Sequence, residues 1–97
     1  MDKKLKNEVE TKAQIIMNYY QSKSYDLAIA NAKKLLKKFP NYVFLLNIIG
    51  LSLQAKKKFD ESINYFNKAL QINPNYFFAL NNIGLSYRLM GNNEEAQ

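Results

Sequence analysis

The chain has 97 residues, enough for one small domain, and 47% of them are hydrophobic, which is usual for a folded protein. It contains no cysteine and no histidine, which excludes a disulfide framework, a thiolate metal site and the commonest general base. The formal charge of +6 would suit an acidic protein, a nucleic acid or an anionic surface, and does not choose among them. No apolar run approaches the roughly 18 residues of a membrane span. The N-terminus also lacks the apolar region of a signal peptide, so we expect a cytoplasmic protein.

Apolar residues spaced by three and four predict two helices at the start of the chain. The first runs from about 2 to 22. Ser24 is a candidate N-cap for the second helix, because its hydroxyl can accept a hydrogen bond from an unpaired backbone N–H. Pro40 ends this helix, since the residue before a proline is pushed out of helical geometry.

Three further helices follow in the same pattern. Asn41 and Asn75 each follow a proline and are N-cap candidates for the third and fifth helices, which run to about Ala55 and Met90. The fourth helix is predicted over about 59–72. No segment shows sustained two-residue alternation, so we predict no strand and an all-α fold.

Two turns are predicted where the helical pattern breaks, at Lys56-Lys57-Lys58 and at Gly91-Asn92-Asn93. After the second turn a sixth helix has barely begun when the chain stops at Gln97. The apolar face of Leu80, Ile83 and Tyr87 would then lack its partner helix. We therefore expect either that Gln97 is the edge of a longer protein or that self-association covers this C-terminal repeat face.

An internal repeat organises the second half of the chain. Pro40-Asn41-Tyr42 recurs as Pro74-Asn75-Tyr76, and Gly50 recurs as Gly84, each 34 residues later. Six further residues around the first glycine recur at the same distance. They are Phe44, Leu46, Asn47, Ile49, Leu51 and Ser52. A fixed period of this length indicates a stacked repeat architecture and favours binding over catalysis.

The repeated residues resemble the tetratricopeptide repeat. The pattern of large, small and proline positions of that family matches a repeat from about 43 to 76, and the matching residues are Leu46, Ile49, Gly50, Leu53, Ser62, Phe66, Ala69 and Pro74. A weaker repeat covers about 9–42, and a partial third one covers about 77–97. The resemblance implies a single domain over residues 1–97, an α-solenoid of about two and a half antiparallel helix-turn-helix repeats.

In this reading the glycines lie where the two helices of a repeat cross closely. We expect Gly50 to face Ser62 and Gly84 to face Ala96. Replacing Gly84 with leucine is then expected to overpack the crossing and to destabilise the protein by roughly 1–3 kcal/mol.

The resemblance also implies a binding surface, because the first helices of successive tetratricopeptide repeats line a concave groove that holds a peptide or partner protein. Aromatic and aliphatic groups would offer pockets there, and amides would bond a peptide backbone. Packing between repeats is an equally weighted interpretation of the same side chains. The candidate binding residues are Tyr20, Phe44, Asn47, Leu51, Gln54, Phe78, Asn81, Asn82, Leu85 and Arg88.

Two specialised forms of the groove do not match. The two-carboxylate clamp of some family members is absent, because its positions hold Ala13, Met17, Ile48, Phe78 and Asn82. We therefore do not expect chaperone-tail binding. The asparagine ladder of O-linked N-acetylglucosamine transferase is matched by Asn82 alone.

Charged residues suggest structural roles more than catalysis. Lys33, Lys34, Lys37 and Lys38 are predicted to share one face of the second helix, which we interpret as a solvated outer surface in preference to an anion site. Asp60 occurs at a helix start, where negative charge suits the helix dipole. With no nucleophile beside a base, we expect no enzyme activity, no metal and no cofactor.

The leading hypothesis is a protein-interaction module that binds a peptide or partner protein in its concave groove. The second hypothesis is the N-terminal arm of a larger enzyme such as a glycosyltransferase or sulfotransferase, which would hold no catalytic residue itself. A basic RNA-binding or anion-binding repeat protein ranks last, because no phosphate loop or known nucleic-acid motif accompanies the lysines.

Overall fold

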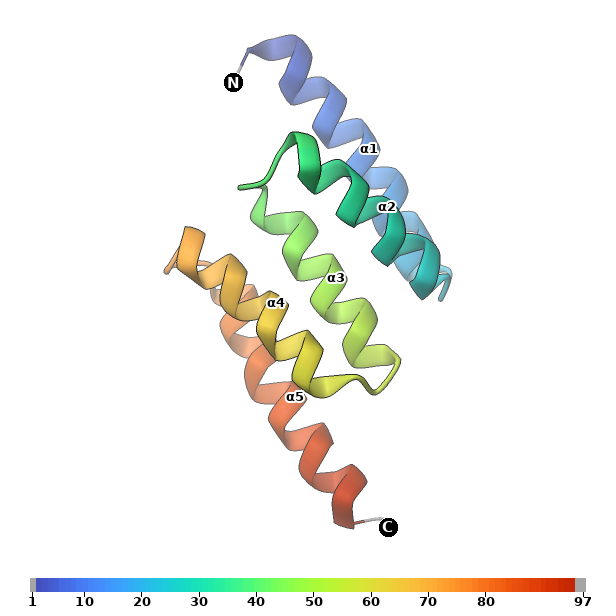
Figure 1. Ribbon diagram of the computed structural model, residues 1–97, viewed down its shortest axis with the longest axis vertical. Coiled ribbons are helices and arrows are strands. Elements are labelled where there is room, and N and C mark those ends of the chain that lie inside the picture. The colour runs from blue at the N-terminus through green and yellow to red at the C-terminus, as the bar shows by residue number, and fades with distance from the viewer. Residues whose placement is uncertain (1, 96–97) are drawn as a thin grey trace.

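The computed structural model describes residues 2–95, with side chains through residue 92, and consists of α-helices joined by short turns (Figure 1). The five helices are α1 (Lys3–Gln21), α2 (Tyr25–Lys38), α3 (Val43–Ala55), α4 (Phe59–Ile72) and α5 (Phe77–Glu95). No strand occurs in this described part, so the predicted all-α solenoid is confirmed. The molecule is elongated, with principal extents of 49 × 28 × 17 Å.

The helices form two layers. Each helix packs against the next in the chain, and α3 also contacts both α1 and α5, so the first helices of successive repeats are neighbours. Figure 1 shows α2 in front of α1 and α4 in front of α5, with α3 between them. None of these helices within residues 2–95 is both long enough and apolar enough to cross a bilayer.

Only α1 begins with a side-chain cap among α1–α4. The Leu5 amide donates to Asp2 Oδ1 at 3.0 Å. Ser24 does stand at the N-cap of α2, as predicted, but its side chain makes no capping bond. The predicted caps Asn41 and Asn75 are wrong.

Both Pro-Asn-Tyr segments start their helices later than the sequence suggested. The N-cap of α3 is Tyr42, and α5 begins at Phe77. At each start a backbone bond spans three residues, from the Leu45 amide to the Tyr42 carbonyl at 3.0 Å and from the Ala79 amide to the Tyr76 carbonyl at 3.1 Å. A tightened first turn therefore takes the place of an asparagine cap.

The turns inside the first two repeats are confirmed and share one geometry. Lys23 and Lys57, 34 residues apart, both have a φ of 64°. This left-handed conformation costs a lysine roughly 1 kcal/mol, so the packing of the following helix must stabilise it.

The predicted turn over residues 91–93 is wrong, since α5 continues to Glu95. Gly91 stands at the repeat position of Lys23 and Lys57, yet it is helical here. Continuing the helix adds a backbone hydrogen bond for each residue, and within the described residues no second helix packs on α5 to favour a turn. The sixth helix, predicted to begin after this turn, is therefore absent up to Glu95, and its remaining residues lie outside the described part.

The core has two clusters that meet at α2 and α3. The larger joins α1, α2 and α3 around residues such as Val9, Ala32 and Ile48. The smaller joins α3, α4 and α5 around Leu46 and Phe66. Burial of these apolar faces gives most of the stability of short helices, which are marginal in isolation.

Gly50 does lie at a close helix crossing, but its neighbour is Phe66 and not Ser62 as predicted. A methyl group added to Gly50 would lie 2.6 Å from Cδ1 of the fully buried Phe66 ring. The aromatic side chain of α4 therefore occupies the space that the missing Cβ leaves on α3. Ser62 instead donates a hydrogen bond to the Phe59 carbonyl at 2.7 Å, which turns it toward its own helix.

Gly84 differs from its repeat counterpart. Among the described residues nothing lies within 4 Å of the position of a Cβ at Gly84, so the structure does not support the predicted overpacking by leucine. The expected contact with Ala96 lies outside the described residues. Leu80 and Tyr87 are 53% and 59% exposed, as the sequence suggested, but Ile83 packs against the α3–α4–α5 cluster.

Candidate functional site

The ten predicted binding residues all lie on the first helices of the repeats. Tyr20 is on α1, four residues are on α3, and five are on α5. Because α3 contacts both neighbours, these helices form one continuous surface on the side away from α2 and α4. The residues on it fall into a buried polar group, a half-buried apolar group and an exposed group.

The polar group joins α3 to α5. The Asn82 amide donates to Asn47 Oδ1 at 3.1 Å, and Gln54 Nε2 donates to the Asn82 carbonyl at 3.2 Å. Asn47 and Gln54 are only 6% and 9% exposed. These three predicted contacts for a peptide backbone are therefore used within the protein, where they fix the register of α5 on α3.

Two serines that the sequence analysis did not select extend this network. Gln54 Nε2 also bonds Ser86 Oγ at 2.8 Å, and Ser86 Oγ lies 2.9 Å from Ser62 Oγ on α4. Ser62 and Ser86 are fully buried. The recurrence of Ser52 at Ser86 was the available signal, but it did not reveal the contact, because Ser52 Oγ has no hydrogen-bond partner in the described residues.

The half-buried apolar group rests on the core. Phe44 and Tyr20 pack against the α1–α2–α3 cluster, and Leu51 packs against the α3–α4–α5 cluster. Burial, and to a smaller extent the neighbouring Tyr25, raises the pKa of the Tyr20 hydroxyl, so this group is neutral at physiological pH. Each of these side chains therefore both supports the fold and presents an edge to the surface.

The exposed group lies on α5. Phe78 is 70% exposed, with its ring centroid 5.6 Å from that of Tyr76, and Asn81 and Arg88 are also exposed. Leu85 is half-buried between them. Their spacing of three, four and three residues places them on one face of the helix. This face combines an aromatic ring, an amide and a guanidinium that are free to meet a ligand.

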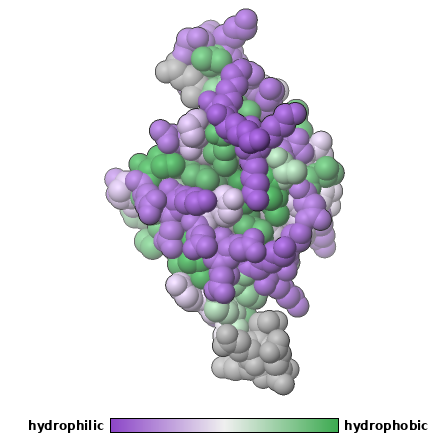
Figure 2. All heavy atoms as spheres, in the orientation of Figure 1, coloured by the Kyte–Doolittle hydropathy of each residue, from purple (hydrophilic) through white to green (hydrophobic). Residues whose placement is uncertain are grey.

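The predicted lysine face of α2 divides between two sides. Lys33 Nζ lies 5.9 Å from the ring centroid of Tyr65 on α4, whereas Lys34 and Lys38 line a groove toward α1. Figure 2 shows hydrophilic side chains spread over this face of the molecule with apolar groups between them. The prediction of one four-lysine face is therefore wrong.

Ion pairs neutralise part of the positive charge. Glu8 Oε1 lies 3.2 Å from Lys12 Nζ, and Glu8 Oε2 lies 3.0 Å from Lys38 Nζ. Lys38, and then Lys12, hold the pKa of the Glu8 carboxyl below its usual range. Lys56 pairs with Asp26 across the two repeats and lowers the pKa of that carboxyl. In the part of the chain that the structure describes, no group of three or more acidic, histidine or cysteine side chains could hold a metal ion.

Comparisons with known proteins agree with the repeat geometry. One tetratricopeptide repeat model matches residues 43–76, and a second matches residues 65–97. The chain belongs to the tetratricopeptide repeat family. No curated protein sequence matches it significantly.

Solved structures of MamA are similar to this tetratricopeptide repeat chain. One MamA mutant is 32% identical, with a TM-score of 0.73 over 91% of this chain and 48% of that chain. A second mutant is 31% identical, with a TM-score of 0.75 over 92% and 65%. MamA AMB-1 is 33% identical, with a TM-score of 0.72 over 87% and 46%. The chain thus spans less than two thirds of each of these proteins.

Family and fold together support a protein-interaction scaffold. Tetratricopeptide repeat proteins bind protein partners and are typically non-enzymatic.

Proposed function

We propose that this chain binds a segment of a partner protein on the surface formed by α1, α3 and α5. The supporting observation is the exposed row of Phe78, Asn81 and Arg88 beside the half-buried Leu85. An aromatic anchor next to a guanidinium is typical of residues that contribute most to protein interfaces. The half-buried edges of Phe44 and Leu51 continue the surface onto α3.

The buried amides define what the partner segment can contact. Asn47, Gln54 and Asn82 already bond one another or Ser86, so they contribute stiffness to the surface. The free polar contacts are then those of Asn81 and Arg88. A stiff surface loses little conformational entropy when it binds, which favours affinity. We therefore propose apolar contacts to Phe78 and Leu85 with polar contacts at the exposed positions.

The test is a cross-linking pull-down from cells that naturally make the protein. The bait is the chain itself, compared with a Phe78→Ala/Arg88→Glu double variant and with Ile72→Ala as a matched control. Ile72 is 41% exposed but lies at the end of α4, away from this surface. A partner kept by the parent and by Ile72→Ala but lost by the double variant supports the proposal. A partner kept equally by all three contradicts it.

The remaining hypotheses stay predictions. An N-terminal arm of a larger enzyme would use the same surface to recruit a substrate or partner. An RNA-binding or anion-binding role is less favoured, because Glu8 and Asp26 already pair with three of the lysines. The cytoplasmic location, the lack of catalysis and the self-association of the C-terminal face also remain predictions.

A further inference from the structure

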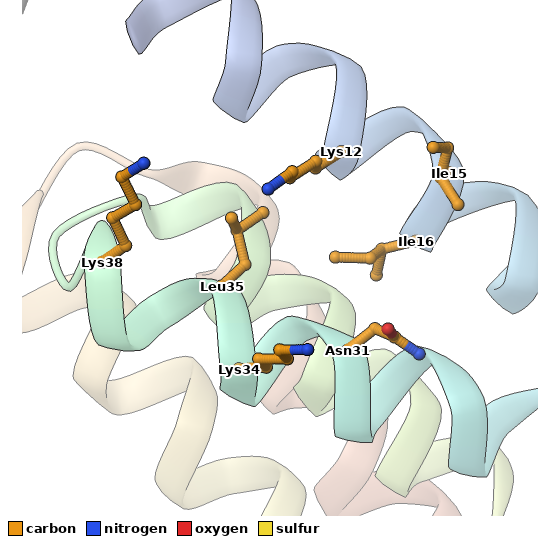
Figure 3. Close-up of a pocket in the computed structure, with 7 residues that line it drawn as sticks. All are labelled: Lys12, Ile15, Ile16, Asn31, Lys34, Leu35 and Lys38. Carbon is orange, nitrogen blue, oxygen red and sulfur yellow. The ribbon is translucent and has the colours of Figure 1, made fainter.

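A groove of about 360 Å³ opens between α1 and α2 at the N-terminal end of the solenoid (Figure 3). Ile16 and Leu35, 3% and 7% exposed, form its floor, and Ile15, 48% exposed, lies at its edge. In Figure 3, Lys12, Ile16 and Leu35 reach into the space between the two helices. The residues lining the groove are Lys12, Ile15, Ile16, Asn31, Lys34, Leu35 and Lys38. This groove faces away from α3 and is separate from the surface proposed above.

The repeat shows what kind of object such a groove accepts. Ile49 and Ile83 stand at the repeat position of Ile15, at successive steps of 34 residues. Ile49 is fully buried in the cluster that α2 helps to form, and Ile83 packs on the cluster that α4 helps to form. At both places the second helix of the preceding repeat covers this position. In the described residues no helix covers Ile15, so the surface has the geometry of a helix seat.

The charges around this seat differ from those one repeat later. Lys12 stands where α3 has Leu46, and Lys38 stands where α4 has Ile72. Lys34 is the third ammonium group of the groove and makes no ion pair within the described residues. The single carboxylate of Glu8, shared by Lys12 and Lys38, cannot neutralise all three lysines. A helix seated here would meet an apolar floor between positive rims.

We propose that this groove docks an acidic amphipathic helix from a partner protein. Its apolar stripe packs on Ile15, Ile16 and Leu35, and its Asp or Glu side chains pair with Lys34 on one rim and with Lys12 and Lys38 on the other. Apolar contact supplies affinity, while charge pairing selects acidic over basic helices and speeds association. A helix of about two turns spans the lining of α2, so a ligand of about 18 residues gives the seat a margin at both ends.

The experiment measures fluorescence anisotropy with a labelled peptide of about 18 residues, long enough to form a helix. The peptide is made of Leu, Ala and Glu, with Leu at helical spacings of three and four and Glu on both flanks. A scrambled peptide of the same composition is the ligand control. The expected result is saturable binding of the patterned peptide, which weakens as salt rises because the charge pairs are at the surface.

Three variants identify the site. Lys34→Glu is expected to weaken binding about fivefold, since one exposed pair is lost and a repulsion is added. Ile15→Asn should weaken it through the apolar floor. Lys68→Glu, the same charge change one repeat later and outside the groove, should leave affinity unchanged. Circular dichroism of each variant checks that the helices are intact.

Several results would overturn the proposal. They are the absence of binding at low salt, equal binding of the scrambled peptide, or unchanged affinity in Lys34→Glu and Ile15→Asn. Loss of binding on Phe78→Ala would assign the peptide to the α1–α3–α5 surface instead. A second copy seated in the groove would appear in sedimentation as a concentration-dependent dimer that Ile15→Asn dissociates, and it would likewise replace the proposed ligand.

Discussion

α3 and α5 have the same residue at seven matched positions, yet the two helices occupy different environments. Leu46 on α3 is 5% exposed, whereas its counterpart Leu80 on α5 is 53% exposed. Gly50 lies against the Phe66 ring, whereas nothing in the described residues lies within 4 Å of a Cβ at Gly84. α3 packs between α2 and α4, while α5 packs against α4 and the edge of α3. The same sequence is therefore core in one repeat and surface in the next.

This comparison teaches that a repeat position has no fixed burial. A residue in a solenoid is buried by neighbouring helices, so its exposure depends on how many helices flank it. The differences between α3 and α5 can be tested with matched substitutions, in which one change is made at both repeat positions and the sign of the effect is compared.

The largest contrast is expected for glycine to alanine. At Gly50 the added methyl would overlap Phe66, which is fully buried and has no free space, so we expect a loss of about 1–3 kcal/mol of unfolding free energy. At Gly84 the methyl meets nothing, and alanine favours a helix over glycine by about 1 kcal/mol, so we expect a gain. Thermal melts should move in opposite directions, by roughly 4–8 °C per kcal/mol for a domain of this size. Equal shifts of the same sign would contradict the comparison.

A smaller contrast is expected for serine to alanine. Ser86→Ala removes a hydroxyl that bonds Gln54 and contacts Ser62, so we expect a loss of about 1–2 kcal/mol. Ser52→Ala removes a buried hydroxyl without a partner in the described residues, so we expect a change within about 0.5 kcal/mol or a small gain. Urea denaturation of both variants measures the difference. A larger loss at Ser52 than at Ser86 would show that the network does not hold α5 on α3.

The smallest effect concerns the helix starts, where the two repeats agree. Burial raises the pKa of the Tyr42 and Tyr76 hydroxyls, with a smaller contribution from Glu10 at Tyr42 and from Tyr42 at Tyr76. The folded state thus holds its protons at a pH where the unfolded chain loses them. Both groups therefore stabilise fully below about pH 10, and this stability is lost as pH rises through the raised pKa values.

Absorbance of tyrosinate during an alkaline titration tests this expectation, with Tyr42→Phe and Tyr76→Phe as matched variants. Each substitution should remove one late-titrating group and flatten the fall in melting temperature above about pH 10. If only one of the two tyrosines titrates late, the environments of α3 and α5 already differ at their first turns.

The sequence by itself determined the helices and their period. Apolar residues at three-residue and four-residue spacings mark helical faces locally, which is why the predicted range of the fourth helix agrees with Phe59–Ile72. The repeated Pro-Asn-Tyr and glycine positions likewise sufficed for the family, because they depend on residue types at fixed separations. The ten binding candidates lie on the first helices for the same reason, although their role in binding remains a prediction.

Only the tertiary structure decided which of these residues are available. Asn47 and Asn81 are the same residue at the same repeat position, but Asn47 is bonded to Asn82 and Asn81 is exposed. Gly91 lies where two lysines form left-handed turns, and it remains helical because no described helix folds back onto α5. Burial, hydrogen bonding and turn formation all depend on contacts between residues distant in sequence, and identical local sequences cannot encode the different neighbours that they meet.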